Sequence, residues 1–201
     1  MRCSGIVLAG GRSRRMGFDK RRLRLWEPDG PTLLERTCAL LAPLCAELIV
    51  VLNDPEAWPG LAARLVCDRL PESGALGGLY SGMLAAQHEY CLVVGADMPF
   101  LSAALLSAML AYPRPYQALV PRHAEGLEPL HAIYQRQTHS LIDLLIRNGE
   151  RRLSAFIERL DAVFLSPEFW SRYDPLQRAF FNLNTPEDVE RARALLRDQS
   201  T

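Results

Sequence analysis

The sequence predicts a three-layer α/β/α fold with a mostly parallel central sheet. Short apolar runs alternate along the chain with longer stretches that repeat apolar residues at helical spacing. The apolar runs lack the in-and-out alternation of a half-exposed strand, so helices should cover their strands on both faces. Strands that alternate with helices pair in parallel through right-handed crossovers, which places helices on both sides of one sheet.

The expected elements follow one another without a linker or an internal repeat. The expected strands span residues 5–8, 47–52, 65–67, 91–95, 118–121 and 162–165. The expected helices span residues 32–43, 76–88, 102–112, 135–148, 151–160 and a last stretch from 185 onward. The first helix begins with a capping-box pattern, Thr32 with Glu35. The last begins at Thr185 with Pro186 at its first position, and its final few residues should fray.

Size and composition indicate one domain over residues 1–201, because the chain is 49% hydrophobic and 23% charged. The formal charges balance at 23 each, so there is no electrostatic case for a nucleic acid or an anionic membrane as partner. Five scattered cysteines without a C-x-x-C pair argue against a disulfide framework and a zinc site. No stretch reaches the length of a membrane span, and a soluble cytoplasmic protein is expected.

A glycine-rich segment follows the first strand. Gly10 and Gly11 follow it after Ala9, and five residues separate Gly11 from Gly17. This spacing fits neither the dinucleotide fingerprint nor the P-loop. Paired glycines nevertheless let backbone N–H groups approach an anion, at the strand end where α/β proteins bind ligands. With the charges of Arg15 and Lys20, the segment is a candidate polyphosphate site, and the alternative is a tight turn with solvated arginines.

Lys20 is the only lysine among the 23 basic residues. An ammonium is a compact point charge and a guanidinium a broad planar fork, so a site that keeps lysine favours the smaller cation. Seven of the 23 basic residues lie between positions 12 and 24, so chance alone, at 7/23, gives this placement about three times in ten. The lysine therefore supports a phosphate site only together with the glycines.

Three more strands are followed by residues with oxygen-bearing side chains: Asn53, Asp68 and Asp97. Magnesium takes one or two protein carboxylates together with substrate phosphates, so Asp97 alone is enough to hold a magnesium nucleotide. The alternative is that Asp97 caps the helix after Pro99. A carboxylate such as Asp68 accepts the N–H donors of guanine, whereas the alternative for Asp68 and for Asn53 is an Asx turn.

The segment Leu8 to Lys20 resembles the signature of the molybdenum cofactor guanylyltransferases, the MobA-like NTP transferases. The resemblance rests on the double glycine after Ala9 and on the Asp-Lys ending, whereas cytidylyltransferase branches usually begin Leu-Ala-Ala-Gly. It continues in order through residues 74–78, 97–99, 128–132, 149–152 and 182–187. Nearly the whole chain is covered, and the implied fold is the Rossmann-like nucleotidyltransferase fold.

The resemblance implies transfer of GMP from GTP to the terminal phosphate of molybdopterin, or of its molybdenum-loaded form, with release of pyrophosphate. It implies that Lys20, Arg15 and Asp97 act in catalysis, with Asp97 as the Mg²⁺ ligand and Asn182 facing molybdopterin. The residues it implies for GTP binding are Leu8, Ala9, Gly10, Gly11, Lys20, Asn53, Asp68 and Asp97. Transient contact with molybdenum-insertion and acceptor proteins is also implied.

Two other functions stay open on the sequence alone. One is a cytidylyltransferase or another nucleotidyltransferase of the same fold. The family often has Gly-Pro-Leu-Ala-Gly where this chain has Gly-Ala-Leu-Gly-Gly over residues 74–78, so this loop should be less preorganised for base selection. The other is a nucleotide-binding regulator without catalysis, against which the presence of both Lys20 and Asp97 speaks.

Overall fold

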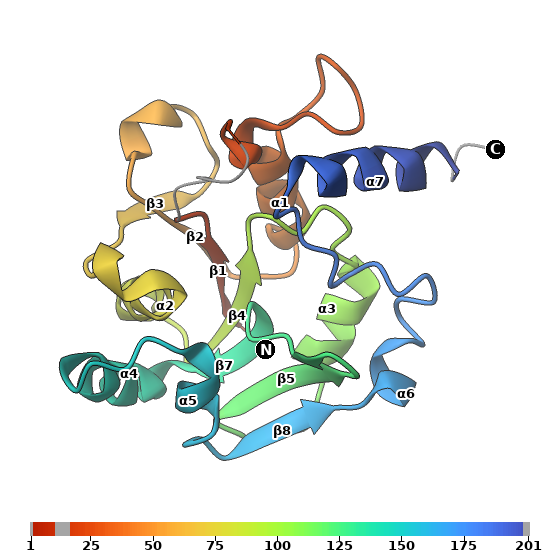
Figure 1. Ribbon diagram of the computed structural model, residues 1–201. Helices are drawn as coiled ribbons and strands as arrows, with labels where there is room; N and C mark the ends of the chain where they lie inside the picture. The colour runs from red at the N-terminus through yellow and green to blue at the C-terminus, as the bar shows by residue number, and fades with distance from the viewer. Residues whose placement is uncertain (1, 11–16, 199–201) are drawn as a thin grey trace.

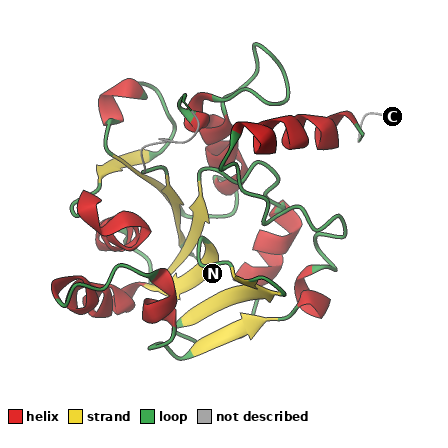
Figure 2. Ribbon diagram, viewed as in Figure 1, coloured by secondary structure: helices red, strands yellow, loops and turns green. Residues whose placement is uncertain are grey.

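One mixed sheet forms the centre of the molecule (Figures 1 and 2). The computed structural model describes residues 2–10 and 17–198, so the predicted site residues Gly11 and Arg15 and the last residues, for which fraying is predicted, lie outside the described residues. Over the described residues the sheet has eight strands in the order β3-β2-β1-β4-β7-β5-β6, with β8 beside β5. The strands are β1 Ser4–Leu8, β2 Glu47–Leu52, β3 Arg64–Cys67, β4 Tyr90–Gly95, β5 Ala118–His123, β6 Gly126–Leu127, β7 His131–Gln135 and β8 Ala162–Leu165.

Helices cover both faces of this sheet, which confirms the predicted layering (Figure 1). The α-helices are α1 Leu33–Leu41, α2 Gly74–Ala85, α3 Ala103–Leu110, α4 His139–Arg147, α5 Leu153–Ile157, α6 Pro167–Trp170 and α7 Pro186–Arg197. The short 3₁₀ turns are η1 Lys20–Arg22, η2 Pro55–Ala57, η3 Pro71–Ser73 and η4 Arg136–Thr138. Helices α2, α4 and α5 lie on one face, and α1, α3 and α6 lie on the other. None of the described helices combines the length and apolarity needed to cross a membrane.

The central strands β1, β2 and β4 are buried on both faces, as the apolar runs predict, whereas the predicted burial is wrong for β3 and β8, which lie at the edges of the sheet and are partly exposed. Successive side chains of a strand point to opposite faces. Val7, Val50 and Val94 therefore pack under α1 and α3, whereas Ile6 and Val93 pack under α2. Burying an aliphatic side chain of this size stabilises the fold by about 1.5–3 kcal/mol. The two apolar clusters fix the central strands between two helical layers.

The sheet is parallel from β3 to β4 and mixed beyond β4, where β8 pairs in parallel with β5. Strands β3, β2, β1 and β4 pair in parallel, whereas β7 pairs antiparallel to both β4 and β5. Strand β7 is absent from the predicted elements, and the predicted helix over residues 135–148 begins too early, because α4 begins at His139 after the turn η4. The apolar run of β7, residues 132–134, is too short to stand out beside the strong helical period that follows it.

The two predicted capping patterns are present. The Thr32 hydroxyl accepts a hydrogen bond from the Glu35 N–H at 3.3 Å, and the Glu35 carboxylate accepts from the Thr32 N–H at 2.7 Å. Thr185 caps α7 in the same way with Asp188, and Pro186 takes the first helical position. Each box satisfies N–H groups that a helix end otherwise leaves without partners, so it fixes where the helix begins.

Glycines bring α2 close to the sheet. A Cβ atom on Gly82 would lie 2.6 Å from Ile6 Cγ2 and 3.2 Å from Val51 Cγ2, so β1 and β2 occupy that space. On Gly78, the nearest atom to a Cβ would be Leu8 Cδ2 at 3.6 Å, an ordinary van der Waals distance. Gly78 and Gly82 therefore meet different surroundings, although both face the sheet.

We expect Gly82→Ala to lower the free energy of unfolding by about 1–2 kcal/mol, because overpacking against branched side chains outweighs the gain in helix propensity. Urea unfolding followed by circular dichroism measures this change. Gly78→Ala is the matched control in the same helix, and we expect its stability to be unchanged or raised by up to about 1 kcal/mol. Equal stabilisation by the two substitutions would contradict the close packing of α2.

Candidate functional site

Four parallel strands end at the same edge of the sheet. Leu8 of β1 lies opposite Val51 of β2 and Gly95 of β4, and Leu52 lies opposite Cys67 of β3. The residues that follow these strands therefore meet at one edge, which is where open α/β sheets bind ligands. Of the predicted site residues, this edge carries Ala9, Gly10, Asn53, Asp68 and Asp97.

The edge brings Lys20 and Asp97 into contact. Lys20 Nζ lies 2.6 Å from Asp97 Oδ2, and the two side chains are 22% and 23% exposed. The helix that follows Asp97 is capped by another residue, because the Ser102 hydroxyl accepts a hydrogen bond from the Leu105 N–H at 3.2 Å. The Asp97 carboxylate is therefore engaged by a cation at the strand end and does not serve as a helix cap.

The segment before α7 completes this contact. Lys20 Nζ also donates to the Leu183 carbonyl at 3.1 Å, and the Leu183 N–H donates to the Asp97 carbonyl at 2.9 Å. Leu183 is fully buried beside Val189 of α7. The neighbouring Asn182 donates from Nδ2 to the Phe180 carbonyl at 2.9 Å. The sequence pointed to Asn182 but not to Leu183, because Leu183 makes its contacts through backbone groups, which every residue type has.

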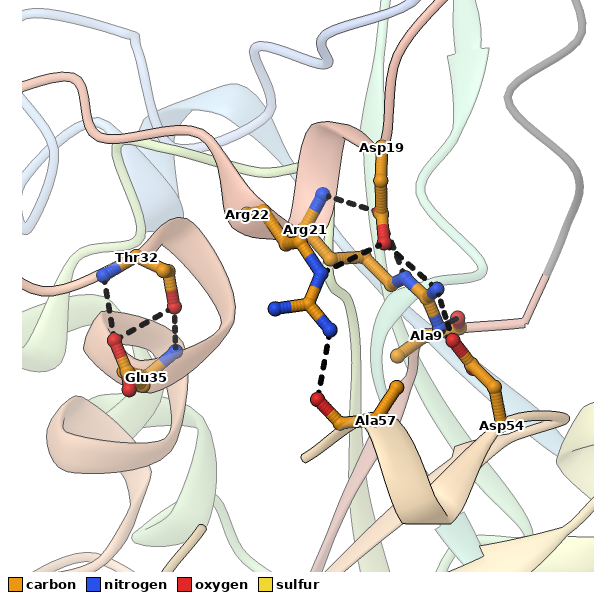
Figure 3. A network of polar contacts seen from close by, with 8 residues as sticks. All are labelled: Ala9, Asp19, Arg21, Arg22, Thr32, Glu35, Asp54 and Ala57. Carbon is orange, nitrogen blue, oxygen red and sulfur yellow. Dashed lines mark hydrogen bonds and ion pairs between the residues drawn. The ribbon is translucent and has the colours of Figure 1, made fainter. Parts of the chain in front are cut away.

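A second network surrounds Arg21 in the turn η1 (Figure 3). Its guanidinium donates to both oxygens of Asp54, at 2.6 and 2.7 Å, and to both oxygens of Asp19, at 2.8 Å each. It also donates to the Ala9 carbonyl at 3.3 Å. Sequence reasoning did not select Arg21, because its contacts with Ala9 and Asp54 join residues that are distant along the chain and nothing in the residue types pairs them.

The ionisation of this network follows from these contacts. Burial raises the pKa of Asp19, but its hydrogen bonds with Arg21 outweigh that effect and hold the pKa below its usual value. Burial likewise lowers the pKa of Arg21, whereas the hydrogen bonds to Asp54 and Asp19 raise it above the usual value. Both groups are therefore charged throughout the neutral pH range.

Asp68 makes the Asx turn that the sequence left as an alternative. Its Oδ1 accepts from the Leu70 N–H at 2.9 Å and from the Ser81 hydroxyl at 3.0 Å. Asn53 differs, because the residue two positions on is Pro55, which has no N–H to donate. Among the described residues its side chain has no hydrogen-bond partner, and it is exposed at the strand end.

The site has few candidate metal ligands. Within residues 2–10 and 17–198, no three His, Cys, Asp or Glu side chains lie together as a metal-binding group. A metal held by Asp97 would take its remaining oxygens from water or from substrate phosphates, a coordination that is typical of magnesium. Glu128 lies within electrostatic reach of Asp97: burial raises the pKa of Glu128, its contact with His123 lowers it, and the Asp97 charge raises it further.

Comparison with known proteins identifies the family of this chain. The protein-family model described as the MobA-like NTP transferase domain matches residues 5–163 of this chain. A protein of Chloroflexus aggregans described as a probable molybdenum cofactor guanylyltransferase is 50% identical over 199 residues, which is 98% of this chain and 96% of the relative. A molybdenum cofactor guanylyltransferase of Desulfosudis oleivorans is 31% identical, over 96% of each chain.

Solved structures extend the likeness to the fold. The molybdopterin-guanine dinucleotide biosynthesis protein A of Archaeoglobus fulgidus superposes with a TM-score of 0.81 at 27% identity, over 97% of this chain and 99% of that one. A 2-C-methyl-D-erythritol 4-phosphate cytidylyltransferase of Thermus thermophilus shares the fold, with a TM-score of 0.70 at 21% identity over 98% of this chain and 100% of that one. With the family model and the relatives above, these matches establish that the chain belongs to the MobA-like NTP transferase family.

Proposed function

We propose that this protein transfers GMP from GTP to the terminal phosphate of molybdopterin, or of its molybdenum-loaded form. The observation that carries this proposal is the meeting of Lys20 and Asp97 at the sheet edge, 2.6 Å apart, in a chain whose relatives are named guanylyltransferases of this cofactor. A cation and a carboxylate side by side suit a substrate that brings both phosphates and a metal. The 201 residues act as one domain.

The reaction needs no general base. The terminal phosphate of molybdopterin is already ionised at neutral pH, so one of its oxygens attacks the α-phosphorus of GTP directly. The bond from the α-phosphorus to the bridging oxygen breaks, and pyrophosphate leaves with the electron pair. Catalysis then consists of positioning the two phosphates and stabilising the charge that builds up on them.

The chain supplies the charge and the positioning. Lys20 turns its ammonium from Asp97 toward the triphosphate, and Arg15 adds a second cation. The segment from Leu8 to Gly11 contacts the nucleotide; because the Ala9 N–H donates to the Val51 carbonyl at 2.9 Å, the N–H groups offered to the phosphates come from the glycines that follow Ala9. Asp97 holds Mg²⁺, which when bound supplies positive charge that neutralises the triphosphate. The single carboxylate fits that cation because the substrate brings the remaining oxygens.

The other predicted residues divide between the two substrates. Asp68 and Asn53, at the ends of β3 and β2, bind the guanosine. Asn182 lies beside Leu183, which contacts both Lys20 and Asp97, and it faces the pterin substrate. Transient contacts with the proteins that insert molybdenum and accept the product complete the proposal.

The deciding experiment is mass spectrometry of the products formed with molybdopterin, magnesium and one nucleoside triphosphate at a time. We expect the guanine dinucleotide with GTP and at most traces of product with CTP. A cytosine dinucleotide as the main product would make the chain a cytidylyltransferase. GTP binding without any product at saturating pterin would instead indicate a regulator without catalysis.

We expect Lys20→Ala to lower kcat by on the order of 10²–10³, as loss of one preorganised charge-stabilising donor does. Lys20→Arg keeps the charge but not the shape, and we expect it to lower kcat by about tenfold. Arg147→Lys is the control, because Arg147 is 75% exposed on α4 and pairs only with Asp143 among the described residues. Wild-type turnover in Lys20→Arg would contradict the role of the ammonium.

Asp68→Asn tests base selection without removing the Asx turn. The amide oxygen still accepts from the Leu70 N–H, so the change is confined to the oxygen that has no hydrogen-bond partner among the described residues. We expect kcat/KM for GTP to fall by about 5–150-fold, which corresponds to about 1–3 kcal/mol of transition-state stabilisation, since one carboxylate contact to guanine is lost. Steady-state kinetics with GTP measure this, and equal losses with GTP and ATP would argue against a contact to the base.

A further inference from the structure

Lys20 and Arg21 are neighbours in the turn η1, but they contact different partners. Lys20 contacts Asp97 and Leu183, at the side of the site nearest β4 and α7. Arg21 contacts Asp19, Asp54 and Ala9, at the side nearest β1 and β2 (Figure 3). In the proposed mechanism Lys20 stabilises the charge of the triphosphate, whereas Arg21 has no assigned role.

The partners of Arg21 are the two ends of the glycine-rich segment and the loop after β2. Ala9 directly precedes this segment, and Asp19 directly precedes Lys20 at its other end. Asp54 follows β2 and leads into the turn η2. One guanidinium therefore ties together three pieces of backbone, and two of them, Ala9 and the turn that carries Lys20, belong to the proposed GTP site.

The contact needs the shape of arginine. The Arg21 side chain is only 16% exposed, and its N–H groups reach two carboxylates and a carbonyl at once. A planar guanidinium has five donors in a fixed fork, whereas a lysine ammonium has three donors on one atom and does not span the same partners. Lysine at this position would keep the charge and lose most of the bridging.

The contact also affects the charge that a triphosphate meets. Asp19, directly before Lys20, and Asp54, in the loop after β2, carry negative charges beside the proposed site of the GTP triphosphate. Arg21 pairs with both carboxylates, at 2.8 and 2.6 Å, and offsets part of that charge. Without it, two partly buried carboxylates would repel the incoming nucleotide.

We propose that Arg21 is a positioning residue that holds Ala9 and Lys20 in the arrangement that binds the triphosphate of GTP. This inference rests on the proposed function. Because Arg21 organises the free protein and does not touch the reacting atoms, its loss lowers the fraction of molecules that are ready to bind. Such a loss raises the KM for GTP and leaves kcat nearly unchanged.

Steady-state kinetics of Arg21→Lys test this inference. We expect the KM for GTP to rise on the order of tenfold, with kcat within about twofold of the wild type and the KM for molybdopterin unchanged. Asp54→Asn should raise the KM for GTP in the same direction by a smaller factor, because Asp19 still holds Arg21. Arg147→Lys makes the same exchange in an exposed ion pair and should alter none of these values.

A purely structural role predicts a different pattern. If Arg21→Lys only reduced the amount of folded protein, kcat would fall and the KM for GTP would stay the same, and that result would overturn the inference. Hydrogen exchange of the amides of residues 17–23 gives a second readout. We expect faster exchange there in Arg21→Lys than in the wild type, and equal exchange would also overturn it.

Direct binding keeps this test separate from the proposed reaction. Calorimetric titration with GTP and magnesium needs no turnover, and we expect Arg21→Lys to bind GTP on the order of tenfold more weakly than the wild type. If the wild type binds GTP but forms no guanine dinucleotide, the proposed reaction fails and the titration still decides the role of Arg21. Equal affinities of the two proteins would disprove that role.

Discussion

The ion pair between Lys20 and Asp97 is the contact on which the arrangement of the site depends. It joins the turn after the glycine-rich segment to the loop after β4, 77 positions apart in the sequence. Leu183 joins the same pair through its carbonyl and its N–H, which attaches the segment before α7. Desolvation offsets much of the attraction in such a pair, so its main effect is to set where these three segments meet.

The sequence was sufficient for the fold at the centre of the sheet, where each strand is an apolar run and the helices show a helical apolar period. Thr32 and Thr185 mark helix starts that the structure confirms. The antiparallel strand β7 was missed, because its short apolar run passes directly into the η4 turn. The carboxyl ends of parallel strands also predict the ligand-binding edge of the sheet, and this is why the sequence alone points to Asp68 and Asp97.

Residue type alone could not separate turn formation from ligand binding. In Asp68 the two are compatible, because Oδ1 makes the Asx turn and the other oxygen has no hydrogen-bond partner among the described residues. For Asn53 the sequence alone excludes an Asx turn, since Pro55 lacks the N–H that such a turn needs. The contacts of Leu183 and Arg21 could not be predicted from the sequence, because they depend on which groups, distant along the chain, the fold brings together.

The neighbouring cations Lys20 and Arg21 show why this chain, which otherwise uses arginine, keeps one lysine. Arg21 bridges two carboxylates and a carbonyl, a task for a planar fork that stays in place. Lys20 has one carboxylate and one carbonyl as partners, and in the proposed reaction its flexible stem lets the ammonium leave both for the triphosphate. A guanidinium at position 20 would bind Asp97 through two hydrogen bonds and would leave it less readily. An ammonium therefore suits position 20, where the proposed reaction requires the cation to move from Asp97 to a phosphate.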